Sequence, residues 1–241
     1  PTPRRGRPGP AASPTSPRSG GGGLPPGSPA GELREGEAAL SLLPFKNPLT
    51  VLTLSGAEVQ ALLTETITTT LPASAHAGKF PYGGHLRYSF QETDAGKAGQ
   101  LTRLQWKTAG GQWQDLVDTK HYRVVTNAYS ANGNDGWQAL ARAQRQSPEN
   151  QSPENQSAER VDLAWVAGQL TAFPVLAVAQ RGEQLSAVYG PGKALDCKAA
   201  KVDCGTDAAS FVDYVRHARP LVTALDEETV TLLRAGQADA P

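Results

Sequence analysis

Alternation of apolar and polar residues is clearest at residues 49–54, Leu-Thr-Val-Leu-Thr-Leu, and predicts a half-buried β-strand. Directly after it, Ser55 is followed three residues later by Glu58, a capping-box pattern that marks the start of a helix. Four apolar residues then recur at helical spacing, namely Val59, Leu62, Leu63 and Ile67. We therefore expect a helix over residues 56–68.

The remaining pattern predicts further strands and helices along the chain. Three strands are expected at residues 86–91, 101–107 and 122–127, and a strand or buried segment at 175–179. Helices are expected at 161–170, 210–218 and 227–235, with a short helix or turn at 38–43. Because helices are interspersed with strands, we expect a mixed α/β (α+β) domain, in which one mixed sheet of about four to five strands packs against helices.

Composition divides the chain into three parts. Residues 1–31 are rich in Pro, Gly and Arg and lack aromatic and β-branched apolar residues, so we expect this segment to be disordered. It is either a native linker or the product of a shifted reading frame. The ordered domain is expected over residues 32–236, followed by a tail at 237–241. Within the domain, the pentapeptide Gln-Ser-Pro-Glu-Asn occurs twice in tandem, which predicts an expanded polar surface loop over 146–157.

Charge and cysteine content narrow the classes of function. The formal net charge is +0, so overall charge gives no hint of the strong basic patch on which a nucleic-acid binder usually relies. No run approaches the length of about 18 apolar residues that a membrane span needs. Cys197 and Cys204 lie close together in a polar stretch and form either a disulfide or two unpaired surface thiols. We favour the disulfide, which indicates an oxidising compartment.

Two loops at strand ends are the candidates for ligand binding. Residues 43–48, Leu-Pro-Phe-Lys-Asn-Pro, precede the first predicted strand, and residues 126–137 follow a later one. The second loop is dense in Asn, Gly and Asp, which adopt unusual backbone angles and offer short polar side chains. Loops at strand ends often carry ligand contacts, although composition alone leaves an ordinary turn open.

These two loops and the elements between them carry a resemblance to a known family. The quoted motifs are Leu-Pro-Phe-x-Asn before a strand, Leu-Ser-Gly-Ala-Glu-Val opening a helix, Gly78-Lys79-Phe80-Pro81, Leu86-Arg87-Tyr88, and Tyr122 to Asn127 running into Gly133-Asn134-Asp135-Gly136-Trp137. In this order they resemble the C-terminal domain of bacterial 5'-nucleotidases, a family that also contains UDP-sugar hydrolases and 2',3'-cyclic-nucleotide phosphodiesterases. The resemblance covers roughly residues 31–140, and residues 211–215 resemble the family's closing helix.

The resemblance implies roles for five residues. In the family, two aromatic side chains sandwich the nucleobase, and their positions are Phe45 and Tyr129 here. The resemblance further implies that Asn47 hydrogen-bonds a base edge, that Asp135 accepts from the ribose hydroxyls, and that Gly78 lets the base approach the backbone. An aromatic stack contributes about 1–3 kcal/mol per base with little regard to base identity. The alternative is that both aromatic residues belong to the core and Asp135 caps a turn.

The sequence also departs from the family pattern. Family members have an Asn-x-Gly-Gly-x-Arg segment shortly before the first loop, whereas residues 20–25 here are Gly-Gly-Gly-Gly-Leu-Pro, without the Asn or the Arg. The family hydrolyses phosphate esters in an N-terminal metallophosphatase domain that holds two divalent metal ions. The four histidines here match none of its ligand signatures (His76, His85, His121 and His217). We therefore expect no catalytic residue, metal or cofactor in this chain, and a metallophosphatase domain in cis or encoded upstream.

Three hypotheses follow from these observations. The first is a nucleotide- or nucleoside-recognition domain of a periplasmic or secreted 5'-nucleotidase-type phosphohydrolase, which does not turn over substrate alone. The second is a non-catalytic remnant of such a domain that no longer binds nucleotide. The third, an independent hydrolase of another type, is disfavoured because neither a Gly-x-Ser-x-Gly elbow nor a P-loop is present.

Overall fold

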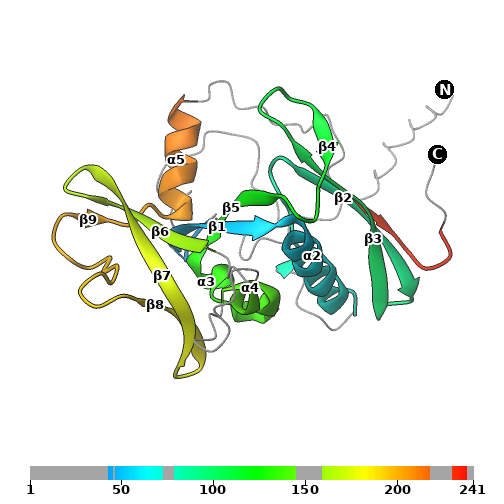
Figure 1. Cartoon of the computed structure of the whole chain (residues 1–241), viewed down its shortest axis with the longest axis horizontal. Helices are drawn as coiled ribbons and strands as arrows, with labels where there is room; N and C mark the ends of the chain where they lie inside the picture. The colour runs from blue at the N-terminus through cyan, green and yellow to red at the C-terminus, as the bar shows by residue number, and fades with distance from the viewer. Residues whose placement is uncertain (1–42, 46, 73–78, 145–158, 218–229, 238–241) are drawn as a thin grey trace, which may run out of the picture.

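A computed structural model describes residues 43–45, 47–72, 79–144, 159–217 and 230–237. It confirms the mixed α/β class, with helices packed against β-sheets (Figure 1). The described strands form two sheets instead of the expected single sheet, one of six strands and one of four. Four expected features lie wholly or mostly outside the described residues: the 1–31 segment, the polar repeat loop 146–157, all but the last residue of the helix or turn at 38–43, and all but the first residue of the tail at 237–241.

The larger sheet has the strand order β5-β1-β6-β7-β8, and β9 pairs with β6. Its strands are β1 (Leu49–Ser55), β5 (His121–Asn127), β6 (Glu159–Val166), β7 (Gln169–Arg181), β8 (Gln184–Tyr189) and β9 (Val202–Asp203). All these pairs are antiparallel. β1 lies between β5 and β6, so residues distant in sequence meet along its two edges.

The smaller sheet has the order β10-β2-β3-β4. Its strands are β2 (Leu86–Asp94), β3 (Ala98–Lys107), β4 (Trp113–Asp115) and β10 (Val230–Leu233). β10 runs parallel to β2, and the other pairs are antiparallel.

The helices are α2 (Gly56–Thr70), α3 (Ala128–Ala131), α4 (Gln138–Ala143) and α5 (Asp207–His217), with a 3-10 turn, η3 (Asn134–Gly136). Figure 1 shows α2 between the two sheets. Its predicted capping box is confirmed: the Ser55 hydroxyl accepts from the Glu58 N–H at 3.2 Å, and the Glu58 carboxylate accepts from the Ser55 N–H at 2.7 Å. These bonds satisfy backbone donors that the helix itself leaves unpaired.

One hydrophobic core joins the two sheets. β1 contributes Leu52 and Leu54, β2 contributes Tyr88 and Phe90, and α2 lies between them. The apolar face of α2 consists of Val59, Leu62, Leu63 and Ile67, the residues whose spacing predicted the helix. Because both sheets cover the same helix, the described parts share a single core.

The predicted strands at 49–54, 86–91, 101–107, 122–127 and 175–179 are confirmed, as is the helix at 210–218 over its described residues, which belong to α5. The predicted helix over 161–170 is wrong, because this stretch contains the end of β6, a turn and the start of β7. The buried positions of β6 are Arg160, Asp162 and Ala164, so a charged inner face hides the period-two pattern. Ala167 and Gly168 have φ of 50° and 82°, the left-handed geometry of a two-residue hairpin turn.

The predicted helix over 227–235 is also wrong in its described part. Val230–Leu233 form β10, which pairs with β2. Both Val and Thr favour extended backbone, and backbone pairing with the β2 edge stabilises the strand.

Candidate functional site

The two candidate loops meet at one end of the β1–β5 pair. β1 begins at Leu49, which lies opposite Asn127 at the end of β5. One step further, the Ala128 N–H donates to the Pro48 carbonyl at 2.8 Å. The loop that enters β1 therefore lies beside α3, which follows β5. Sequence order alone did not require the two loops to be neighbours.

The predicted aromatic residues occupy these two loops. Phe45 is 65 % exposed, so its ring is not part of the core. Tyr129 is half-buried on α3, and its hydroxyl donates to the Asp135 carboxylate at 3.0 Å. Burial, and then the neighbouring carboxylate of Asp135, raise the pKa of Tyr129 above its ordinary value. The phenol thus stays protonated and remains a donor at neutral pH.

Asp135 lies at the tip of the second loop. Its backbone has φ of 52°, in the left-handed region, and Gly133 and Gly136 on either side have φ of 91° and 87°. Glycine adopts this geometry without a side-chain penalty. The resulting turn leaves the Asp135 side chain exposed, with one carboxylate oxygen bonded to the Tyr129 hydroxyl.

Asn134 fixes this loop to the larger sheet, a role that sequence reasoning missed. Its amide donates to the carbonyls of Tyr129 and Leu185, both at 3.1 Å, and its side-chain oxygen accepts from the Leu185 N–H at 3.0 Å. The side chain thus pairs with the β8 backbone as a neighbouring strand would. Its only sequence signal is its place between Gly133 and Asp135 in the candidate motif.

Lys79, which belongs to a quoted family motif, is a second residue to which the sequence analysis assigned no role. A Cβ built on Gly136 would lie 3.0 Å from the Lys79 Nζ, so this half-buried cation lies against the Asp135 loop. Gly78, the predicted point of close approach for the base, immediately precedes it but lies outside the described residues. A positive charge at this edge favours ligands with acceptor or anionic groups.

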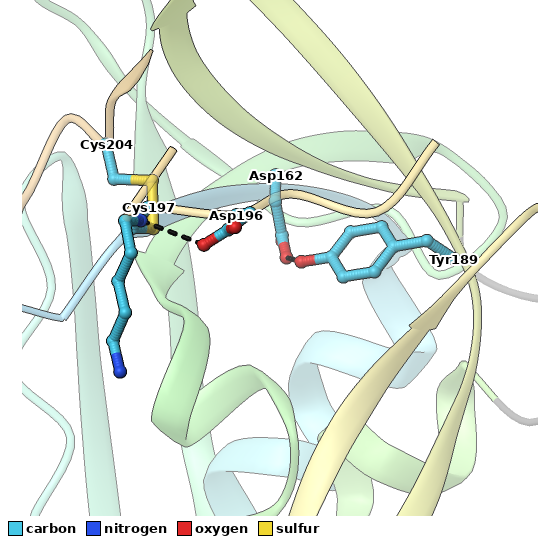
Figure 2. Close-up of a disulfide and its surroundings, with 6 residues drawn as sticks. Asp162, Tyr189, Asp196, Cys197 and Cys204 are labelled. Carbon is cyan, nitrogen blue, oxygen red and sulfur yellow. Dashed lines mark hydrogen bonds between the residues drawn. A yellow bond between two sulfur atoms is a disulfide. The ribbon is translucent and has the colours of Figure 1, made fainter. Parts of the chain in front are cut away.

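A buried polar network supports the second loop from beneath. Arg160 donates to Asp162 through Nε at 2.8 Å and Nη2 at 3.1 Å, and through Nη1 to the side-chain oxygens of Asn132 at 2.7 Å and Gln144 at 3.1 Å. The Tyr189 hydroxyl donates to Asp162 at 2.6 Å, a contact visible in Figure 2. Burial and the Asp162 charge raise the pKa of Tyr189. Because Asn132 ends α3, the network fixes the helix that carries Tyr129.

Cys197 and Cys204 form a disulfide in the structure, so neither is a free thiol (Figure 2). Cys204 directly follows β9, which pairs with β6. The disulfide therefore closes a short loop against the larger sheet.

The described parts of the chain lack the residue arrangements of two other kinds of site. Within those parts, no group of three or more His, Cys, Asp or Glu residues is arranged to hold a metal ion. No described helix has the length and apolar character of a membrane span.

The first loop therefore brings Asn47 and an exposed Phe45 to one end of the β1–β5 pair, and the second brings Tyr129 and Asp135 to the same end.

Comparisons with known proteins match this part of the chain. Residues 19–142 match the family described as the 5'-nucleotidase C-terminal domain, a range that begins within the Pro/Gly/Arg-rich segment.

Two curated relatives cover the same region. The chain is 30 % identical over 102 residues to a probable 5'-nucleotidase of Treponema pallidum, and 32 % identical over 105 residues to an NAD 5'-nucleotidase of Haemophilus influenzae. These matches cover 42 % and 43 % of this chain, and they span only 17 % of the length of each relative.

A solved structure shares the fold over more of the chain. The 5'-nucleotidase precursor of Thermus thermophilus superposes with a TM-score of 0.50 at 24 % identity, over 83 % of this chain and 28 % of that one. Since the family match extends over half of the sequence, this chain belongs to the 5'-nucleotidase C-terminal domain family.

Proposed function

We propose that this chain is the nucleotide- or nucleoside-recognition domain of a 5'-nucleotidase-type phosphohydrolase, and that it binds the base between Phe45 and Tyr129. The observation that carries the proposal is the meeting of two loops at one end of the β1–β5 pair. One loop presents an exposed phenylalanine, and the other presents a tyrosine that is oriented by Asp135.

The residues of these loops supply complementary chemistry. Flat aromatic faces stack on any base, at about 1–3 kcal/mol per stack. Asn47 offers both a donor and an acceptor to a base edge. Asp135 keeps one carboxylate oxygen for the ribose hydroxyls while the other accepts from Tyr129. Gly78 is proposed as the position where the base passes close to the backbone.

Phosphate-ester hydrolysis is proposed to need a further domain. A metallophosphatase domain, in cis or encoded upstream, would hold two divalent metal ions that clamp the phosphate and generate the nucleophile. The present chain would deliver the nucleoside end of the substrate. A periplasmic or secreted location is supported by the Cys197–Cys204 disulfide, because such bonds persist in oxidising compartments.

A second candidate is a domain of the same fold that no longer binds nucleotide. Its specific support is the segment at residues 20–25, where the Asn and Arg of the family pattern are replaced. A cation that approaches the substrate would then be missing from the site.

Calorimetric titration of the full chain with adenosine and with AMP tests the proposal. Saturable binding is expected, and Phe45→Ala and Tyr129→Ala should each weaken it by about 5- to 150-fold, the loss of one stack. Tyr129→Phe is the matched variant, because it keeps the ring and removes only the hydroxyl bond to Asp135. Leu170→Ala removes an apolar side chain of similar exposure, 58 %, and should leave affinity unchanged.

A different result would contradict each part of the proposal. Absence of saturable binding at millimolar nucleoside would support the non-binding alternative. An unchanged affinity in Tyr129→Ala would disprove the aromatic clamp while leaving nucleoside binding intact. Incubation of the full chain with AMP and Mn²⁺, Co²⁺ or Zn²⁺ should release no phosphate, and turnover would contradict the need for a separate catalytic domain.

A further inference from the structure

The loop that carries Phe45 and Asn47 is backed by a segment from far along the chain. The Leu49 N–H donates to the Gly205 carbonyl at 3.0 Å, and the Asp207 N–H donates to the Asn47 carbonyl at 3.1 Å. Between these bonds, Pro48 and Thr206 form an isolated antiparallel bridge. Residues 205–207 thus extend the edge of the site by one short backbone pairing.

Asp207 pairs with both backbone polar groups of Asn47, its carbonyl and its N–H. Besides the N–H bond to the Asn47 carbonyl, its carboxyl group accepts from the Asn47 N–H and, at 2.8 Å, from the Ala208 N–H. Burial raises the pKa of the Asp207 carboxyl, and these backbone donors partly offset that effect. A half-buried carboxyl group that accepts from two backbone N–H groups fixes those groups more strongly than a neutral side chain does.

The disulfide and a tryptophan hold this segment to the larger sheet. Cys204, which is buried, immediately precedes Gly205 and is bonded to Cys197. A Cβ on Gly205 would lie 2.4 Å from the Trp165 ring, so the backbone passes directly over a β6 side chain. With both restraints present, Asp207 has a defined position relative to β1 and β6.

We propose that Asp207 is a positioning residue for the Asn47 side of the nucleobase site, and that the Cys197–Cys204 disulfide holds the segment from which Asp207 acts. This inference rests on the proposed function. Its physical basis is preorganisation: a loop already held in its bound geometry loses less conformational entropy when ligand binds.

The test compares variants of the full chain that distinguish loss of the Asp207 carboxyl group from destabilisation of α5. Asp207→Ala removes the contact to the Asn47 N–H and should weaken adenosine binding about tenfold, equivalent to about 1.4 kcal/mol. Thr206→Ala removes the side chain that accepts from the Ala209 N–H at 3.1 Å and so weakens the start of α5, yet it should leave affinity within twofold. Asp203→Asn, an exposed charge change in the same segment, should have no effect.

Amide hydrogen exchange gives a readout that does not need ligand. In Asp207→Ala the Asn47 amide should exchange at least tenfold faster than in the wild type, whereas amides at the centre of β1 should be unchanged. The Cys197→Ser/Cys204→Ser double variant should show the same local acceleration, together with weaker adenosine binding, at a temperature where circular dichroism shows a folded domain.

Any of four results would overturn the inference. One is that the Asn47 amide exchanges at the same rate in Asp207→Ala as in Asp203→Asn. Another is an affinity loss in Thr206→Ala as large as that in Asp207→Ala, which would assign the effect to general destabilisation. If the wild type binds no nucleoside, the proposed function fails. The positioning role then fails too, because it is defined for that binding site. If the wild type binds and Asp207→Ala alone is unaffected, only the positioning role fails.

Discussion

Replacing Arg160 by methionine removes the centre of the buried network beneath the second loop. The Arg160 and Asp162 side chains are 1 % and 2 % exposed, so solvent does not compensate the loss. Among the residues that the structure describes, the variant leaves the Asp162 carboxylate with the Tyr189 hydroxyl as its side-chain donor, and it removes a donor from the oxygens of Asn132 and Gln144. Breaking a buried pair in this way costs about 3–5 kcal/mol. For a chain of this size the melting temperature should fall by about 6–20 °C.

Equilibrium unfolding in urea, followed by tryptophan fluorescence, measures this loss. Arg103→Met is the matched control, because Arg103 is exposed on β3 and its replacement should change the free energy of unfolding by no more than about 0.5 kcal/mol. The double variant Arg160→Met/Asp162→Leu should recover part of the loss, since no unpaired charge then stays buried. A loss in Arg160→Met no larger than in Arg103→Met would refute the structural role of the network.

Three further predictions concern local structure. Ser55→Ala removes the α2 cap and should lower the free energy of unfolding in urea by about 1 kcal/mol. Gly133→Ala should lower the melting temperature, because φ is 91° and the added Cβ would lie 2.6 Å from the Ala141 Cβ. The Glu92 carboxylate accepts hydrogen bonds from the Ala235 N–H, which has the larger effect, and from the Gly96 N–H, and these bonds lower the pKa of Glu92. Its contribution to the free energy of unfolding is therefore present above the unfolded-state pKa and is lost as pH falls through the folded-state pKa. The free energy of unfolding of Glu92→Gln should therefore fall less than that of the wild type as the pH is lowered from 6 to 3. The difference should develop from roughly pH 5 downward, where carboxyl groups titrate.

Each of these has a direct contradiction. Equal stability of Ser55→Ala and wild type would show that the cap contributes nothing to α2. A Gly133→Ala protein with the wild-type melting temperature would show that the loop relaxes without cost. Parallel pH profiles for Glu92→Gln and wild type would mean that the native contacts of this carboxylate do not favour folding.

The local part of the fold could be predicted because neighbouring residues determine it. The strand at 49–54, the capping box at Ser55 and the apolar face of α2 are each fixed by spacing within a few residues, and each is present. β6 could not be recognised in the same way. Its inner face carries Arg160 and Asp162, and a buried ion pair has no counterpart in a hydrophobic pattern.

The candidate site was predictable only as two separate loops. Family motifs located Phe45 and Tyr129, and the structure adds that the β1–β5 pairing brings their loops together. The contacts that fix these loops were not predictable, because they join distant positions. Asn134 bonds to Leu185, 51 residues away, and Asp207 bonds to the backbone of Asn47. Asn, Asp and Leu at such separations have no local signature.

A crystal structure of the full chain grown with millimolar adenosine tests the central claim most directly. The proposal predicts the adenine ring between the side chains of Phe45 and Tyr129, with the ribose hydroxyls donating to Asp135. Adenine bound elsewhere, or no bound nucleoside beside ordered Phe45 and Tyr129 rings, would contradict it.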